Sequence, residues 1–276
     1  PHAGLGAEGL DLLLRDLTPL PTFPCVIASL LERLEAVSHP VDAVPDGGPM
    51  ADLVGLISSD PPLAARVLSE ARRLRPTGAD TIPAAVAVLQ AEGLRTLALT
   101  TEPLPDVNPA GIDYPALWKH SVAVGVAAAD LAGRLPDPLD GDEAACAGVL
   151  HELGRFVFVH AMPKSFQKAV ETADRRNASI AECEREIIGQ DHAVVGRRLA
   201  RRWRLAPYLQ DVIWLYGQPA EAIPPSVSAP RMVAVVALAD ALSREQGLSF
   251  CPSDTEEGSE ALASRLGLSR EDLSEV

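Results

Sequence analysis

Apolar residues recur every three or four positions along most of this chain, which is the spacing of one face of an α-helix. Nowhere do Val, Ile, Thr and aromatic residues alternate strictly with polar ones between turn dipeptides, as they would in strands. We therefore predict an all-α fold. The expected helices cover residues 7–17, 24–37, 50–58, 61–74, 82–100, 113–134, 143–161, 163–176, 179–188, 192–204, 206–217, 228–246 and 254 to the end.

Helix start signals and a proline-rich break organise the chain. Asp60 followed by Pro61 combines a good N-cap with a residue that suits the first helical position, and residues 80–83 repeat this signal. Residues 102–112 hold three prolines and predict a linker between two helical lobes. We expect an N-terminal lobe at 1–101, a second lobe at 113–250, and a C-terminal helical extension or linker at 251–276.

The composition narrows the class of protein. Hydrophobic residues make up 47% of the chain, which is enough for a folded core. Lys and Arg total 24 against 38 Asp and Glu, so the net charge is 24 − 38 = −14 and broad nucleic-acid binding is not expected. Four cysteines without a CxxC spacing indicate buried thiols in a reducing compartment.

Targeting signals are not evident in the sequence. No run of about 18 uncharged apolar residues occurs, and no basic segment followed by an apolar core stands at the N-terminus. We therefore expect a cytoplasmic protein that neither spans nor binds a membrane. Because Pro1 is not a natural start residue, we also expect neighbouring domains in a longer chain.

The candidate chemistry lies in residues 146–160, where His151 and Glu152 stand side by side in an apolar run that predicts one continuous helix. Burying ionisable groups costs free energy unless each has a partner or binds a metal. The candidate partners are His120, in the preceding long helix, and Asp240, a lone carboxylate in an apolar run. Two imidazoles and two carboxylates would suit iron, manganese or zinc and could activate a water for phosphoester hydrolysis. The alternative is a buried polar cluster that holds no metal.

These residues carry a resemblance to a known family. The order His120, then the pair at 151–152, then Asp240 is similar to the H…HD…D signature of the HD superfamily of metal-dependent phosphohydrolases. Residues 18–247 more specifically resemble the HDOD family, the HD-related output domains of bacterial signalling proteins. The segments that carry the resemblance are 20–24, 57–68, 82–86 with 94–99, 117–121, 148–155, and 191–196 followed by Trp203.

The sequence departs from the family pattern at the metal ligands. Glu152 stands where the family has Asp, and the extra methylene moves the carboxylate by about 1.5 Å, which a metal–oxygen bond of about 2.0–2.2 Å cannot absorb without rearrangement. Arg155 replaces a lysine of active HD enzymes and cannot donate a proton at neutral pH. Residues 215–219 lack the paired histidines common in the family, and no Gly-Tyr-Pro motif of the cyclic-di-GMP hydrolysing relatives is present.

The resemblance implies a two-lobed helical domain, with an N-terminal helical lobe packed on an HD-like helical lobe. It also implies a regulatory or scaffold role, so we expect a non-catalytic signalling module that binds a signalling protein, a neighbouring domain or a small ligand. The alternative is a metal-dependent phosphohydrolase acting on a nucleotide or cyclic dinucleotide. No cofactor is expected unless the four candidate ligands hold iron, manganese or zinc. Candidate ligand-binding residues are Trp118, Arg155 and His192.

Overall fold

The computed structural model describes residues 6–17, 20–36, 48–105, 111–251 and 258–273. This described part holds helices and no strand, with one isolated β-bridge between Thr22 and Pro103, so the predicted all-α fold is confirmed. The helices are α1 (Ala7–Asp16), α2 (Pro24–Ala36), α3 (Pro49–Ser58), α4 (Pro61–Leu74), α5 (Ile82–Leu99), α6 (Tyr114–Arg134), α7 (Gly141–Leu150), α8 (Leu153–Ala161), α9 (Pro163–Arg176), α10 (Ile180–Ile187), α11 (His192–Arg202), α12 (Pro207–Leu215), α13 (Pro230–Glu245), α14 (Ser259–Leu266) and α15 (Arg270–Leu273).

Short polar side chains fix several helix starts, as the sequence indicates. Asp60 Oδ1 accepts a hydrogen bond from the Leu63 amide at 2.8 Å, and Pro61 occupies the first position of α4. Asp191 caps α11 in the same way through the Val194 amide at 2.9 Å. Each cap satisfies an amide that has no carbonyl partner inside its helix.

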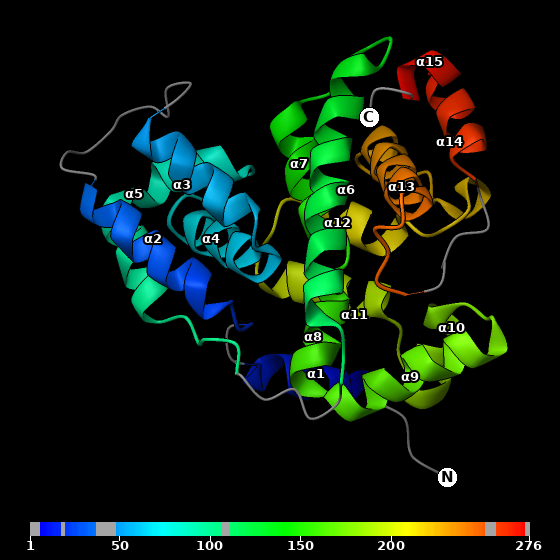
Figure 1. Ribbon diagram of the computed structural model, residues 1–276, viewed down its shortest axis with the longest axis horizontal. Coiled ribbons are helices and arrows are strands. Elements are labelled where there is room, and N and C mark those ends of the chain that lie inside the picture. The colour runs from blue at the N-terminus through cyan, green and yellow to red at the C-terminus, as the bar shows by residue number, and fades with distance from the viewer. Residues whose placement is uncertain (1–5, 18–19, 37–47, 106–110, 252–257, 274–276) are drawn as a thin grey trace.

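The helices form two groups that meet chiefly where α4 packs on α7. In Figure 1, α2 to α5 lie together on the left, while α6 runs vertically with α7 and α13 packed beside it, and α12 packs on α7 and α13. Helix α4 contacts α6, α7 and α8, which joins the groups. Helix α1 lies below α8 in Figure 1, and Asp11 pairs with Arg198 of α11 at 2.9 Å. The exact lobe boundaries stay a prediction.

The start of the predicted linker is tied to the N-terminal segment. The Thr22 amide donates to the Glu102 carbonyl at 3.1 Å, and the Leu104 amide donates to the Thr22 carbonyl at 2.7 Å. Residues 106–110 of that linker lie outside the described part. Trp118 of α6 joins the two groups because its Nε1–H donates to the Ser59 carbonyl at 2.6 Å.

The single helix predicted for residues 143–161 is wrong, because α7 ends at Leu150 and α8 begins at Leu153. The imidazole of His151 explains the break: its Nδ1–H donates to the Gly148 carbonyl at 2.6 Å, and that carbonyl would otherwise accept the Glu152 amide of a continuing helix. Glu152 adopts φ −96° and ψ 21°, outside the helical region. The two candidate ligands therefore lie on a turn between helices.

The C-terminal helix predicted from residue 254 onward is two helices, α14 and α15. Gly267 ends α14 with φ 75°, a left-handed conformation that glycine adopts without steric cost. Leu262 and Ala263 of α14 are buried in the main core, and α14 packs on α13. Residues 252–257 and 274–276 lie outside the described part.

Among the described residues, one helix, α5, is long and apolar enough to cross a membrane. This test uses length and composition alone, and the core helix of a globular protein also passes it. In this fold α5 packs against α2, α3 and α4, and its backbone leaves the helical conformation at Gln90.

Candidate functional site

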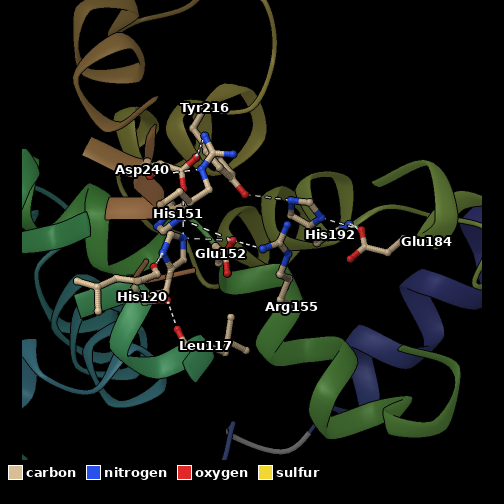
Figure 2. Close-up of polar contacts among 12 residues, drawn as sticks. Leu117, His120, His151, Glu152, Arg155, Glu184, His192, Tyr216 and Asp240 are labelled. Carbon is tan, nitrogen blue, oxygen red and sulfur yellow. Dashed lines mark hydrogen bonds and ion pairs between the residues drawn. The ribbon is translucent and has the colours of Figure 1, made fainter. Parts of the chain in front are cut away.

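Four candidate metal ligands come together from three parts of the chain. His120 lies on α6, His151 and Glu152 on the turn between α7 and α8, and Asp240 on α13. Figure 2 shows their side chains pointing toward one another. All four are buried, with between 0% and 3% of each residue exposed. We call His120, His151, Glu152 and Asp240 the buried cluster.

Three members of the buried cluster are close enough to share a metal ion. One donor atom each from His120, His151 and Asp240 lies within 4.8 Å of the others. His120 Nε2 lies 3.1 Å from Asp240 Oδ1. Glu152 is not in this group, although its Oε1 lies 3.7 Å from His120 Nε2 and 3.8 Å from His151 Nε2.

His151 is arranged as a metal ligand would be. Its Nδ1–H donates to the Gly148 carbonyl, which leaves the lone pair on Nε2 as the second polar function of the ring. That Nε2 is buried and has no hydrogen-bond partner. Burial lowers the pKa of His151 to about 4, and nearby Glu152 offsets this only in part, so the ring is neutral at pH 7.

His120 is arranged differently, because both of its ring nitrogens have acceptors. Nδ1 lies 2.6 Å from the Leu248 carbonyl, which can only accept, and Nε2 faces the carboxylate of Asp240. Burial lowers the pKa of His120, but Glu152 and the hydrogen bond to Asp240 outweigh burial and raise it. The protonated ring is thereby favoured, and a metal ion at Nε2 would have to displace that proton.

Arginines occupy both carboxylates of the buried cluster. Arg155, only 4% exposed, pairs with Glu152 Oε1, and Arg244 lies 3.1 Å from Asp240 Oδ2. Burial raises the pKa of Glu152, but Arg155 and the histidines outweigh it and hold that pKa below its usual value. Burial likewise opposes ionisation of Asp240, yet His120 and Arg244 lower its pKa to about 2. Both carboxylates are therefore charged at neutral pH.

The buried cluster fits a divalent metal ion only in part. Two imidazoles and the Asp240 carboxylate suit iron, manganese or zinc, and a metal held there would polarise a phosphoryl oxygen or activate a water. Glu152, the fourth ligand expected from the sequence, binds Arg155 with one oxygen, while its Oε2 is buried without a hydrogen-bond partner. Three of the four expected ligands can therefore share a metal ion, while the fourth, Glu152, forms an ion pair with Arg155.

A second polar group lies beside the buried cluster. The backbone amide and Nδ1 of His192 both contact Glu184 Oε2, at 2.8 and 2.7 Å, and Nε2 lies 3.1 Å from the Tyr216 hydroxyl. Figure 2 shows these side chains in one line from Glu184 through His192 to Tyr216. The Tyr216 ring meets the His151 ring edge to face, with centroids 4.7 Å apart. We call Glu184, His192 and Tyr216 the histidine line.

Sequence reasoning singled out His192 but missed its two partners. Glu184 is fully buried in α10, where it falls four residues after Ile180 on the same apolar face. That position on an apolar face could have marked Glu184 in the sequence, because a buried carboxylate needs a partner, as Asp240 does. Tyr216 falls within residues 215–219, the segment without the family's paired histidines, and nothing else in the sequence marks it.

The other two candidate ligand-binding residues, Trp118 and Arg155, already have partners within the protein. Trp118 is 6% exposed, and its ring packs with those of Phe23, Tyr114 and Phe156 at centroid distances of 4.2 to 5.9 Å. Arg155 is held by Glu152. Their roles in ligand binding stay predictions.

Comparison with known proteins shows which sequences and structures this chain resembles. The sequence profile of the HDOD domain matches residues 20–219. A curated Treponema pallidum (strain Nichols) protein, described as uncharacterized, is 28% identical over 186 residues, which are 66% of this chain and 35% of that protein. The chain therefore spans about a third of the length of that relative.

Two solved structures share the fold across nearly the whole chain. The MmoQ response regulator from Methylococcus capsulatus str. Bath superposes with a TM-score of 0.70 at 23% identity, covering 93% of this chain and 96% of that one. A virulence factor from Campylobacter jejuni subsp. jejuni superposes with a TM-score of 0.69 at 21% identity, covering 96% and 95%. At these identities the likeness concerns the fold alone.

Proposed function

Because the chain belongs to the HDOD family, we propose that it is a non-catalytic bacterial signal-transduction module that acts by binding a protein or a small ligand. The observation that carries this proposal is the closure of the buried cluster. A catalytic metal centre keeps one coordination position open to water and substrate. Here His120, His151 and Asp240 are each 3% exposed or less, and Glu152 is taken up by Arg155.

The protonation of His120 supports the same proposal. With one nitrogen on the Leu248 carbonyl and the other on Asp240, the ring completes an ion pair without any metal. Arg155 pairs with the carboxylate of Glu152, and Arg244 is a second cation beside Asp240. Such a network of opposite charges is stable in itself, whereas a lone buried charge would not be.

The partner is a signalling protein or a neighbouring domain of a longer chain. The match to about a third of the Treponema relative is consistent with a module inside a larger protein, and the MmoQ protein, which shares the fold, is a response regulator. The net charge of −14 disfavours a nucleic acid as that partner.

A specific observation favours a second function, metal-dependent phosphoester hydrolysis of a nucleotide or cyclic dinucleotide. His151 Nε2 is buried without a hydrogen-bond partner and lies near two further donors. In that function the three donors would hold the metal, and Arg155 would have to leave Glu152 to contact phosphate.

Hydrolysis assays separate the two functions. The protein is supplied with Mn²⁺, Fe²⁺ or Zn²⁺ and tested on bis(p-nitrophenyl) phosphate, on cyclic mononucleotides and on cyclic dinucleotides, with His151→Ala as the matched control. We expect no turnover above that of His151→Ala with any metal. Turnover that requires His151 would overturn the non-catalytic proposal and support the hydrolase.

A further inference from the structure

Four exposed arginines at the adjoining ends of two helices have no carboxylate partner among the described residues. They are Arg75, directly after α4, and Arg201, Arg202 and Arg204, in the last turn of α11 and just beyond it. Within the part of the chain that the structure describes, none of their side chains forms an ion pair or a hydrogen bond. We call these four residues the arginine surface.

Contacts between the two helix ends bring the members of the arginine surface into one region. The Nε–H of Arg72, in α4, donates to the Arg204 carbonyl at 2.5 Å, and the Tyr208 hydroxyl donates to the Asp80 carbonyl at 2.8 Å. Arg72 also forms an ion pair with Asp80, which holds the turn between α4 and α5 in place. Because Arg75 lies in that turn, the fold itself positions it beside the end of α11.

The other exposed arginines of the described part all have partners. Examples are the ion pairs of Arg176 with Glu186 at 2.6 Å and of Arg270 with Glu260 at 2.9 Å. In a chain with a net charge of −14, carboxylates outnumber cations and such pairs form easily. A group of four arginines without carboxylates is therefore an exception, and its like charges repel one another until an anion binds.

Arg204 also occupies a backbone position at which glycine would be more stable. Its φ is 56°, in the left-handed region, and it directly follows the end of α11, where the Leu205 amide donates to the Ala200 carbonyl at 2.9 Å. Glycine is the usual residue at this position because a Cβ is disfavoured there. The Arg204 side chain makes no described contact that offsets this strain, and a role in binding accounts for its presence.

The charges around the arginine surface indicate how large its partner is. The carboxylate of Asp80 lies beside Arg72, and that of Glu70 lies 2.8 Å from Arg73. An extended anion, such as duplex DNA or an anionic membrane, would face these carboxylates and the acidic remainder of the protein. A short acidic segment of a protein can contact the arginines alone, and a guanidinium binds a carboxylate through two parallel hydrogen bonds.

We propose that the arginine surface binds an acidic segment of a partner protein, whose Glu and Asp carboxylates pair with the four guanidinium groups. This inference rests on the proposed function, because it names the chemistry of the partner that the module recognises. The arginine surface shares no residue with the buried cluster. A pocket of about 530 Å³ opens beside the histidine line, and its lining includes none of the four arginines. The proposed partner therefore binds apart from both.

A short fluorescein-labelled peptide of alternating Glu and Ser tests the proposal, with the peptide of alternating Gln and Ser as its uncharged counterpart. Binding to the full chain is measured by fluorescence anisotropy at low ionic strength. We expect the Glu peptide to bind at least about tenfold more tightly than the Gln peptide, and to weaken as salt is added. Equal binding of the two peptides, or no binding of the Glu peptide, would overturn the proposal.

Anionic surfaces of other kinds serve as comparisons in the same assay. Phosphatidylglycerol vesicles and a short DNA duplex compete with the labelled Glu peptide for the protein. We expect neither to displace the peptide, because the acidic remainder of the protein repels an extended anion. Displacement by the vesicles or by DNA would assign the arginine surface to a membrane or to a nucleic acid and would overturn the proposal.

Two double variants locate the binding. Arg201→Gln with Arg202→Gln should weaken binding of the Glu peptide about fivefold, since two exposed ion pairs are lost. Arg175→Gln with Arg176→Gln is the matched control, because these are also consecutive exposed arginines in the last turn of a helix, α9, but already have partners within the protein. The control should bind as the wild type does. Equal losses in the two double variants would show a response to net charge alone and would overturn the assignment.

Arg204→Gly separates binding from structure. Glycine adopts a φ of 56° without steric cost, so the urea midpoint should rise, whereas affinity for the Glu peptide should fall about twofold because one ion pair is lost. Unchanged affinity, or a fall in both quantities, would contradict a binding role for Arg204. Because hydrolysis is measured separately, loss of this inference leaves the non-catalytic proposal standing.

Discussion

His151 and His192 lie on either side of Tyr216 and differ in how their ring nitrogens are hydrogen-bonded. His151 bonds through one nitrogen and keeps Nε2 buried without a partner, whereas His192 bonds through both nitrogens, to Glu184 and to Tyr216. His151 is thus available to a metal ion, and His192 is not unless the Tyr216 hydroxyl moves away. The comparison teaches that a histidine in a family position is a ligand only when its neighbours leave a nitrogen free.

The same contrast holds for the surroundings of the two histidines. Around His151, both carboxylates are paired with cations in a space closed to solvent, which favours a fixed charge network. Around His192, a pocket opens whose lining includes the carboxylates of Glu182, Asp191 and Glu221. The buried cluster is therefore closed to solvent, whereas the histidine line faces a pocket.

The tight crossing of α8 and α11 holds these two regions together, and breaking it should have the largest effect. A Cβ on Gly154 would overlap the His192 carbonyl oxygen and meet the Gly196 amide nitrogen at 2.8 Å. Gly154→Ala should therefore destabilise the fold by more than about 4 kcal/mol, because two backbones would have to separate. Urea denaturation or yield of folded protein measures this.

Gly133→Ala is the matched control for Gly154→Ala. Nothing lies within 4 Å of the added Cβ, and Gly133 is inside α6. We expect unchanged or slightly raised stability, by up to about 1 kcal/mol, since alanine is the better helix former. A Gly154→Ala variant as stable as Gly133→Ala would contradict the close approach.

The charge network of the buried cluster is tested by Arg155→Ala. Removing the guanidinium leaves the Glu152 carboxylate buried beside it without its main cation, which should cost about 3–5 kcal/mol. The control is Arg176→Ala, which breaks the exposed pair with Glu186 at 2.6 Å and should change the denaturation midpoint very little. Similar losses in both variants would show that Glu152 does not depend on Arg155.

The neutral state of His151 predicts a pH dependence of stability. Its pKa falls from 6.5 to about 4 on folding, so the unfolded chain binds the additional proton between these values. Stability contributed by this neutral ring is complete above pH 6.5 and lost as pH falls toward 4, by at most about 3 kcal/mol. Denaturation of the chelator-treated protein at several pH values measures the slope.

His151→Gln provides the reference for that slope, because glutamine does not titrate. The variant should lack the part of the pH dependence between 6.5 and 4, while contributions from the carboxylates below pH 4.5 persist. Parallel curves for the two proteins would mean that His151 has an ordinary pKa in the fold.

The smallest expected effect comes from the histidine line. Tyr216→Phe removes the hydroxyl that shares a hydrogen bond with His192 Nε2 at 3.1 Å but keeps the ring against His151. Losing one buried hydrogen bond should cost about 1 kcal/mol. No change in the urea midpoint would contradict a hydrogen bond at this position.

Much of the fold follows from local signals in the sequence. Asp60 with Pro61 and Asp191 before His192 mark helix starts because capping depends on residues three positions apart. The turn at His151 and Glu152 could not be predicted this way. It depends on an imidazole competing for a backbone carbonyl, and the surrounding apolar pattern is the same for one helix as for two.

The members of the buried cluster could be predicted, but not their states. His120, His151 and Asp240 stand out because ionisable residues in apolar runs need partners. The diversion of Glu152 to Arg155 and the use of the Leu248 carbonyl by His120 depend on three-dimensional packing. Every residue has a backbone carbonyl, so the sequence does not show which one will accept a hydrogen bond from His120.

The metal content of the protein tests the central claim, that the buried cluster is a charge network and not a working metal centre. The protein is purified without chelators and analysed for iron, manganese and zinc by plasma mass spectrometry, beside His151→Ala prepared in the same way. We predict far less than one ion per chain in the wild-type protein and the same trace level in the variant. One ion per chain in the wild type that is absent from His151→Ala would contradict the account.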